Sequence, residues 1–182
     1  AIVNYEDRAT CPIFGDGAAG VLLEATEEPY GLMDEILCSD GEGVKHLHQV
    51  AGGSVKPASH ETVDAREHFI YQEGQAVFKW AVVKMAEATE TILQRNDLTS
   101  EDISFLLPHQ ANMRIIKATG SRLGLDEDKV LINIEKYGNT TSATIPMLMY
   151  ENQNRFKKGD NLILTSFGAG FTWGAIWLKW AI

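Results

Sequence analysis

Apolar and polar positions along the chain follow a helical period in some stretches and short strand-like runs in others, which predicts a mixed α/β fold. The clearest helical pattern covers residues 74–95. Its apolar positions recur at steps of three and four, at Val77, Ala81, Met85, Ala88 and Ile92. A helix of that length would run about 30 Å, roughly the depth of a domain.

Shorter apolar runs predict strands on both sides of this helix. The expected strands are residues 21–25, 32–37, 103–107, 130–134, 161–166 and 171–179. A second helix is expected over residues 143–154, because Pro146 stands early in it and apolar positions follow. Residues 39–59 are rich in glycine and proline and predict a long irregular excursion.

Residues 103–123 are expected to form a strand, a polar loop and a helix, and the loop is the central candidate for a functional site. Pro108 cannot donate to a strand ladder, so the strand ends there and His109 follows its carboxyl end. Asn112 is the expected N-cap of the next helix. In that helix, Met113, Ile116 and Leu123 should face the core, and Arg114, Lys117 and Arg122 should stay exposed.

Asn139 stands in a second polar loop, after the predicted strand 130–134. Because the loops that follow parallel strands lie at the same edge of a sheet, His109 and Asn139 are expected to lie close together. Their N–H groups could then stabilise an oxyanion without adding charge. The structural alternatives are a loop-capping histidine and a turn asparagine after Gly138.

Composition narrows the classes of protein. The chain has 182 residues, 45% of them hydrophobic, which suits one globular domain or one half of a two-part fold. A net charge of −9 argues against nucleic acid as a partner. Cys11 and Cys38 form no disulfide framework, which indicates a cytoplasmic location. No apolar run of membrane-spanning length occurs, so no membrane partner is expected.

Two further motifs carry little weight. Gly15, Gly17 and Gly20 spell GxGxxG, but the segment that follows is too short for a crossover helix, so a glycine-rich turn is expected. His46 and His48 could share one face of a strand, yet no carboxylate or cysteine stands at a supporting spacing. We therefore expect no metal site.

Four motifs together, LLPHQANMRII, KYGNTTSATIP, IFGDGAAG and LTSFGAGFTWGA, closely resemble the carboxyl-terminal half of β-ketoacyl-acyl-carrier-protein synthase III. The resemblance implies one half of the two-half thiolase fold, with a mixed five-stranded sheet covered by helices. It assigns residues 1–30 to the trailing turn and strand of the amino-terminal half. Residues 31–182 would form the carboxyl-terminal thiolase-like domain.

The resemblance implies an acyltransferase of fatty acid initiation. A cysteine takes an acyl group, usually acetyl, from acyl-CoA, and malonyl-acyl-carrier protein then loses CO₂ and condenses with it to a 3-oxoacyl product. His109 and Asn139 would donate to the malonyl thioester oxygen, and the Ala169 backbone N–H would complete the oxyanion hole of the cysteine step. Coenzyme A and phosphopantetheine thioesters would be substrates, and no cofactor is implied.

The same resemblance assigns binding residues and partners. The expected contacts of the acyl carrier protein are Gln110, Ala111, Asn112, Met113, Arg114, Lys79 and Arg122. The expected substrate tunnel is lined by Gly74, Phe78 and Phe167. The partners implied are the acyl carrier protein, an acyl-CoA and, for the full-length protein, a second copy in a homodimer.

One departure from the family pattern concerns the nucleophile. In the family the reactive cysteine lies at a helix start in the amino-terminal half, a place that neither Cys11 nor Cys38 occupies. We therefore expect the chain to be inactive or incomplete without that half. Two alternatives stay open at this point: a papain-like cysteine hydrolase using Cys11, His109 and Asn139, and a non-catalytic module that binds the carrier protein.

Overall fold

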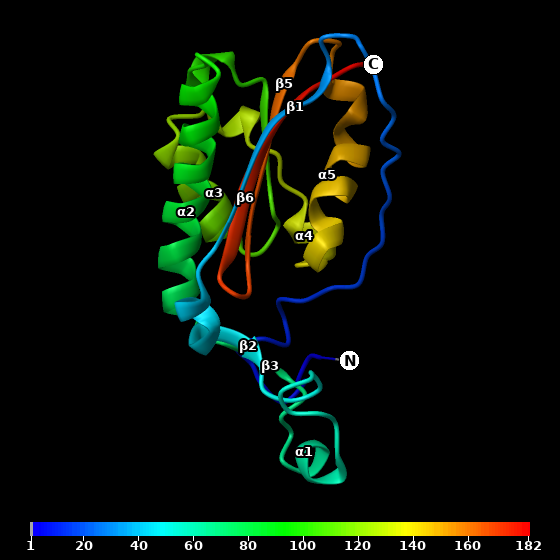
Figure 1. Ribbon diagram of the computed structural model, residues 1–182, viewed down its shortest axis with the longest axis vertical. Helices are drawn as coiled ribbons and strands as arrows, with labels where there is room; N and C mark the ends of the chain where they lie inside the picture. Colours follow the sequence, from blue (N-terminus) through cyan, green and yellow to red (C-terminus); the bar gives the residue numbers. More distant parts are fainter. Residues whose placement is uncertain (1) are drawn as a thin grey trace.

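The computed structural model describes residues 2–182, which fold into three layers (Figure 1). On one face of the main sheet lie α2 (Gly74–Arg95) and α3 (Met113–Arg122). On the other face lies α5 (Thr144–Asn152). The expected α/β class is confirmed, and so are both long helices predicted from the sequence.

The main sheet has the strand order β1-β6-β5-β4. These strands are β1 (Gly31–Ser39), β6 (Thr172–Lys179), β5 (Asn161–Gly168) and β4 (Phe105–Pro108). β4 pairs in parallel with β5, and the other two pairs are antiparallel. The sheet is therefore mixed, as expected.

The number of strands was predicted wrongly, because the main sheet of residues 2–182 has four strands and not five. Val130 makes only an isolated parallel bridge with Leu106, and the chain then turns into α4 (Ile134–Tyr137). The buried Leu131 explains the apolar pattern there without a strand, because it packs in a core cluster with residues of α5 and β5.

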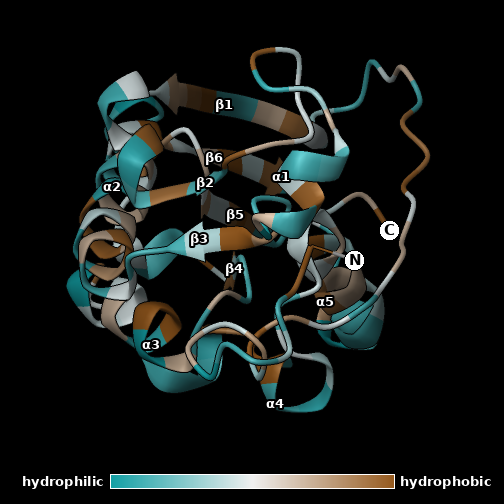
Figure 2. Ribbon diagram, turned by 90° about the horizontal axis from the view of Figure 1, so that it is seen from below, coloured by the Kyte–Doolittle hydropathy of each residue, from teal (hydrophilic) through white to brown (hydrophobic). Residues whose placement is uncertain are grey.

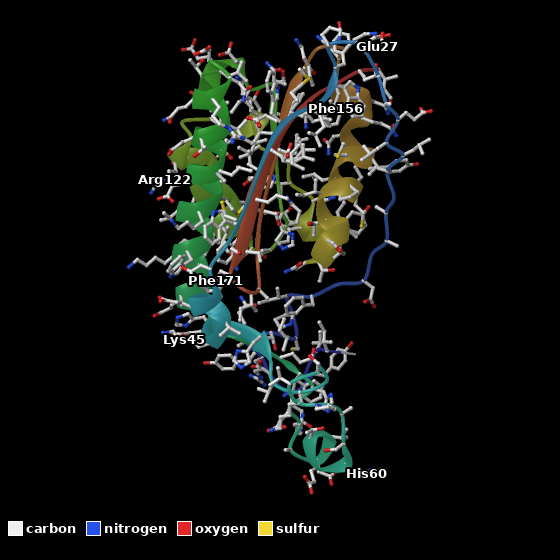
Figure 3. The ribbon with its side chains drawn as sticks, viewed as in Figure 1. Glu27, Lys45, His60, Arg122, Phe156 and Phe171 are labelled. Carbon is white, nitrogen blue, oxygen red and sulfur yellow. The ribbon has the colours of Figure 1, made fainter. Side chains whose placement is uncertain are left out.

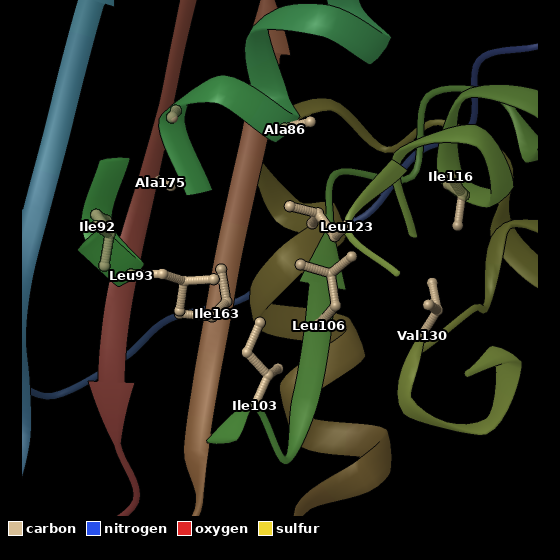
Figure 4. Close-up of a cluster of buried hydrophobic side chains, with 11 residues drawn as sticks. Ala86, Ile92, Leu93, Ile103, Leu106, Ile116, Leu123, Val130, Ile163 and Ala175 are labelled. Atoms are coloured by element: carbon tan, nitrogen blue, oxygen red, sulfur yellow. The ribbon is translucent and has the colours of Figure 1, made fainter. Parts of the chain in front are cut away.

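The apolar stripe of α2 is buried at every position that the sequence indicated. Its carboxyl-terminal part lies in one core cluster with residues of β6, β5 and β4, and Figure 4 shows Leu93 beside Ile163 in this cluster, with Leu106 next to them. Its amino-terminal part meets Phe167 and Phe171 at the β5–β6 hairpin. α2 therefore spans the whole sheet and brings its first turn to the edge where His109 lies.

Residues 40–72 leave the layered body, which confirms the long excursion, although it contains short elements that were not predicted. A two-stranded sheet joins β2 (Leu47–Gln49) to β3 (Ile70–Gln72), and α1 (His60–Asp64) lies at the far end. Figure 3 shows His60 at this tip, away from the main sheet. Arg66 ties the excursion to the start of the chain by donating to Glu6 and Asn4.

The strand expected over residues 21–25 does not form. This segment runs along the outer side of α5 (Figure 1), and Figure 2 shows its apolar part at the edge of the molecule. Val21, Leu22 and Leu23 are 62%, 85% and 78% exposed. An apolar run becomes a strand only when a neighbour completes its ladder, and within residues 2–182 this run pairs with no strand. The proposed division at residue 30 stays a prediction.

Candidate functional site

His109 directly follows β4. Its backbone N–H donates to the Thr165 carbonyl at 2.8 Å, which continues the parallel β4–β5 pairing by one residue. The residue lines a cavity of about 860 Å³ at this edge of the sheet. The expected placement of the histidine at a strand's carboxyl end is therefore confirmed.

The imidazole of His109 is neutral near pH 7. Burial lowers the pKa of His109 to about 4, because the surrounding protein atoms desolvate the charged form. Nδ1 lies 2.6 Å from the Thr144 hydroxyl oxygen. A neutral imidazole has one N–H donor and one acceptor nitrogen, so a single ring nitrogen can donate toward the cavity.

Asn139 lines the same cavity and is held by three hydrogen bonds. Its backbone N–H donates to the Ile13 carbonyl at 2.8 Å, and its own carbonyl accepts the Gly15 N–H at 3.0 Å. Its side-chain Oδ1 accepts the Thr141 N–H at 2.9 Å. This bond fixes the orientation of the side-chain amide. Its Nδ2 group, which is the donor, is then left to bind a molecule in the cavity.

The loop around Asn139 requires an unusual backbone. Gly138 has φ +66°, and Thr141 has φ +54°, a region that costs free energy for a residue with a side chain. The glycine-rich turn of residues 15–20 packs closely here, since a Cβ on Gly15 would lie 2.0 Å from the Tyr137 carbonyl oxygen. The role of this turn is thus to brace the Asn139 loop.

Gln110 was expected at the carrier-protein surface, and the structure corrects this. Its side chain is 0% exposed. Its amide nitrogen donates to the carbonyls of Pro108 and Leu131, at 2.8 and 3.3 Å. Its Oε1 accepts the N–H groups of Asn133 at 3.0 Å and Ile134 at 3.1 Å. Gln110 therefore links the His109 joint to the segment that leads to Asn139.

Glu151 of α5 holds the next part of that segment. Its carboxylate accepts from Asn133 at 2.9 Å, Tyr137 at 2.7 Å and Lys136 at 3.2 Å. The hydrogen bond from Tyr137, followed by that from Asn133, holds the pKa of Glu151 below its ordinary value. The segment that leads from His109 to Asn139 is therefore held by hydrogen bonds to Gln110 on one side and to Glu151 on the other.

Most of the other expected site residues also line the cavity: Gly74, Phe78, Ala111, Asn112, Arg114, Phe167 and Ala169. Asn112 caps α3 as predicted, because its Oδ1 accepts the Arg114 N–H at 2.8 Å. The Arg114 guanidinium lies 5.1 Å from the centre of the Phe78 ring, which joins the first turns of α2 and α3.

Besides the buried Gln110, three expected residues lie outside the cavity lining: Met113, Lys79 and Arg122. Lys79 and Arg122 are exposed, and Figure 3 shows Arg122 on the outer side of the helical layer. Met113 is half-exposed, so its expected place in the core is wrong, whereas Ile116 and Leu123 are buried. The cations of α3 are exposed as expected.

Cys11 does not fit a papain-like centre with His109 and Asn139. It is absent from the residues that line their cavity, although its neighbours Ala9 and Ile13 are present. It lies in a turn that no helix follows. In the described part of the chain, no group of three or more His, Cys, Asp or Glu side chains is arranged to hold a metal ion.

Two residues of the site were not foreseen from the sequence. Thr144 contacts the His109 ring, and Gly15 braces the Asn139 loop. Their motifs, GNTTSAT and FGDG, were visible, but a hydroxyl or a glycine in a loop carries no signal of which distant residue it will meet.

Comparisons with known proteins identify similar sequences and folds. A family model described as 3-oxoacyl-[acyl-carrier-protein (ACP)] synthase III C terminal matches residues 93–180, and one described as 3-oxoacyl-[acyl-carrier-protein (ACP)] synthase III matches residues 1–41. The β-ketoacyl-[acyl-carrier-protein] synthase III of Porphyromonas gingivalis is 59% identical over 181 residues, covering 100% of this chain and 54% of that protein. The chain spans about half the length of the curated relatives it matches.

Solved structures show the same fold. The 3-oxoacyl-(acyl carrier protein) synthase III of Pseudomonas aeruginosa PAO1 aligns with a TM-score of 0.88 and 34% identity, covering 100% of this chain and 56% of that one. The corresponding synthase of Aquifex aeolicus VF5 aligns with a TM-score of 0.86 and 34% identity, covering 98% and 54%. The expected thiolase-like fold is confirmed.

Proposed function

Because the chain belongs to the β-ketoacyl-acyl-carrier-protein synthase III family, we propose that its cavity performs the decarboxylation step of a Claisen condensation. The reaction joins an acyl group from acyl-CoA, usually acetyl, to malonyl-acyl-carrier protein and yields a 3-oxoacyl-acyl-carrier protein. The nucleophilic cysteine would come from the part of the family protein that lies beyond the matched half. No cofactor is needed, because the thioester groups activate both the carbonyl carbon of the acyl group and the methylene carbon of malonate.

The observation that carries this proposal is that His109 and Asn139 line one cavity, each with a neutral donor available. When malonate loses CO₂, negative charge moves onto the thioester oxygen to form an enolate. Two N–H donors at that oxygen stabilise the developing charge, and each is worth on the order of 3 kcal/mol. Apolar walls such as Phe14 and Phe167 would weaken hydration of the malonyl carboxylate and favour its loss.

Binding of the substrate arm is proposed for the first turns of α2 and α3. Gly74 and Phe78 line the cavity from α2, and Arg114 lines it from α3. A phosphopantetheine chain from coenzyme A or the carrier protein would enter along them. Ala169, at the β5–β6 turn, would supply its backbone N–H in the cysteine half-reaction.

The exposed cations of α3 support docking of an acidic carrier protein, because Arg114, Lys117 and Arg122 are exposed without an acidic residue between them. Lys79 on α2 would extend this surface. A homodimer and a cytoplasmic location are proposed on the family resemblance alone. Among residues 2–182, no helix is both long and apolar enough to cross a membrane.

The test measures CO₂ release from malonyl-acyl-carrier protein by the complete polypeptide in which this chain occurs. His109→Ala and Asn139→Ala should each lower the rate by a factor on the order of 10² to 10³. His60→Ala and Asn154→Ala are matched controls, because both residues are exposed and outside the cavity. Wild-type protein that binds the carrier protein but releases no CO₂ would instead establish the non-catalytic binding module.

A further inference from the structure

The orientation of the His109 ring depends on one neighbouring side chain. Nδ1 lies 2.6 Å from the Thr144 hydroxyl oxygen, and Thr144 is only 2% exposed at the start of α5. The neutral ring carries a single proton. The direction of the Thr144–His109 hydrogen bond therefore decides whether Nε2 is a donor or an acceptor toward the cavity.

Two proton arrangements satisfy the heavy-atom positions. The Thr144 hydroxyl also lies 2.9 Å from the Thr141 carbonyl oxygen. In the first arrangement the hydroxyl donates to that carbonyl and accepts Nδ1–H, which leaves Nε2 without a proton. In the second, the hydroxyl donates to Nδ1, and the ring keeps its proton on Nε2.

Two features favour the second arrangement. The Thr141 carbonyl already accepts the backbone N–H of Thr144, so it stays paired when the hydroxyl turns away. The neutral imidazole in solution also prefers its proton on Nε2.

We propose that Thr144 is a positioning residue whose hydroxyl donates to Nδ1 of His109 and thereby keeps the proton on Nε2 as a donor into the cavity. Its importance for the reaction rests on the proposed function, because an enolate oxygen needs a donor from this ring. The tautomer itself is a property of the resting protein and is measurable without turnover.

The direct test is nitrogen NMR of the complete polypeptide labelled with ¹⁵N-histidine. The spectrum of His109→Gln identifies the His109 signals. Near pH 7, wild-type protein and Thr144→Ser should both show Nδ1 as the bare nitrogen and Nε2 as the protonated one. A protonated Nδ1 in wild-type protein would overturn the proposal.

The kinetic test uses Thr144→Val, which keeps the shape of the side chain and removes the hydroxyl. The turnover number for CO₂ release should fall by about 10-fold to 100-fold, with little change in KM, because the substrate arm binds elsewhere. Thr144→Ser should restore most of the rate. Thr91→Val, which removes a hydroxyl bonded within α2 to Glu87, is the matched control and should leave the rate unchanged.

The failures of this proposal and of the proposed function are distinguishable. Wild-type rates in Thr144→Val overturn the positioning role while the effect of His109→Ala still stands. Wild-type rates in His109→Ala overturn the proposed function and with it the catalytic importance of Thr144. In that case the NMR spectrum alone accepts or rejects the hydrogen-bond direction.

Discussion

The two proposed donors are held in different ways. His109 follows a regular strand, and its ring is oriented by one hydroxyl, that of Thr144. Asn139 lies in an irregular loop, where backbone groups of Ile13, Gly15 and Thr141 fix both its main chain and its side chain. One donor therefore depends on a side chain, and the other depends on a braced backbone.

This difference separates the effects that substitutions should have. A change at the histidine side can remove the orientation of the ring and leave the fold intact. A change in the glycine-rich turn must move the Asn139 backbone, so activity and stability should fall together. Gln110 connects the surroundings of the two donors. It binds the carbonyl of Pro108, next to His109, and the N–H groups at the start of α4, which precedes Asn139.

The largest effect is expected for Asn139→Asp, which keeps the size of the side chain and replaces the amide donor. A carboxylate there would repel both the malonyl carboxylate and the developing enolate, so CO₂ release should fall by a factor on the order of 10³ or more. Thermal unfolding should change little. A rate within tenfold of wild type would show that Asn139 donates nothing to the reacting oxygen.

Gly15→Ala tests the backbone brace. The new Cβ would approach the Tyr137 carbonyl oxygen, so the turn or the Asn139 loop must shift. We expect a loss of stability of about 1–3 kcal/mol, measured by denaturant unfolding, together with a lower rate of CO₂ release. Gly20→Ala is the control, because its Cβ would meet nothing within 4 Å. Equal behaviour of the two variants would contradict the brace.

Gln110→Ala and Arg114→Ala should separate an effect on stability from an effect on binding of the carrier protein. Removing its Oε1 leaves the N–H groups of Asn133 and Ile134 without their acceptor, which should cost about 1–3 kcal/mol in unfolding free energy. Arg114→Ala should instead raise the KM for the carrier protein in a salt-dependent way. If Gln110→Ala changed that KM while stability stayed constant, the buried role of Gln110 would be wrong.

The last effect concerns the pH dependence of stability and needs no assay of activity. The folded pKa of His109, about 4, lies below the unfolded value near 6.5, so only the unfolded chain gains a proton between them. Stability should therefore fall as pH drops from about 6.5 toward 4, by about 3 kcal/mol in all. The unfolding free energy, measured by urea titration at several pH values, should fall in this way for wild type and not for His109→Gln. If the two proteins showed the same pH dependence, the His109 ring would not be desolvated in the folded protein.

Much of the fold could be predicted because it follows from local periodicity. The α2 pattern and the Asn112 cap each concern residues that are close in sequence. The place of His109 also followed from a short apolar run ended by Pro108.

The errors share another cause, which is partners far away in the sequence. Gln110 stands in a polar motif but is buried because Asn133 and Ile134 supply its donors. Leu22 stands in an apolar run but is exposed, since residues 2–182 pair no strand with it. Thr144 became part of the site only when α5 packed beside β4.

The most direct measurement is a crystal structure of the complete polypeptide with a malonyl thioester analogue that cannot lose CO₂. We expect one thioester oxygen within about 3 Å of both His109 Nε2 and Asn139 Nδ2. A thioester oxygen that meets neither nitrogen, or only one of them, would contradict it.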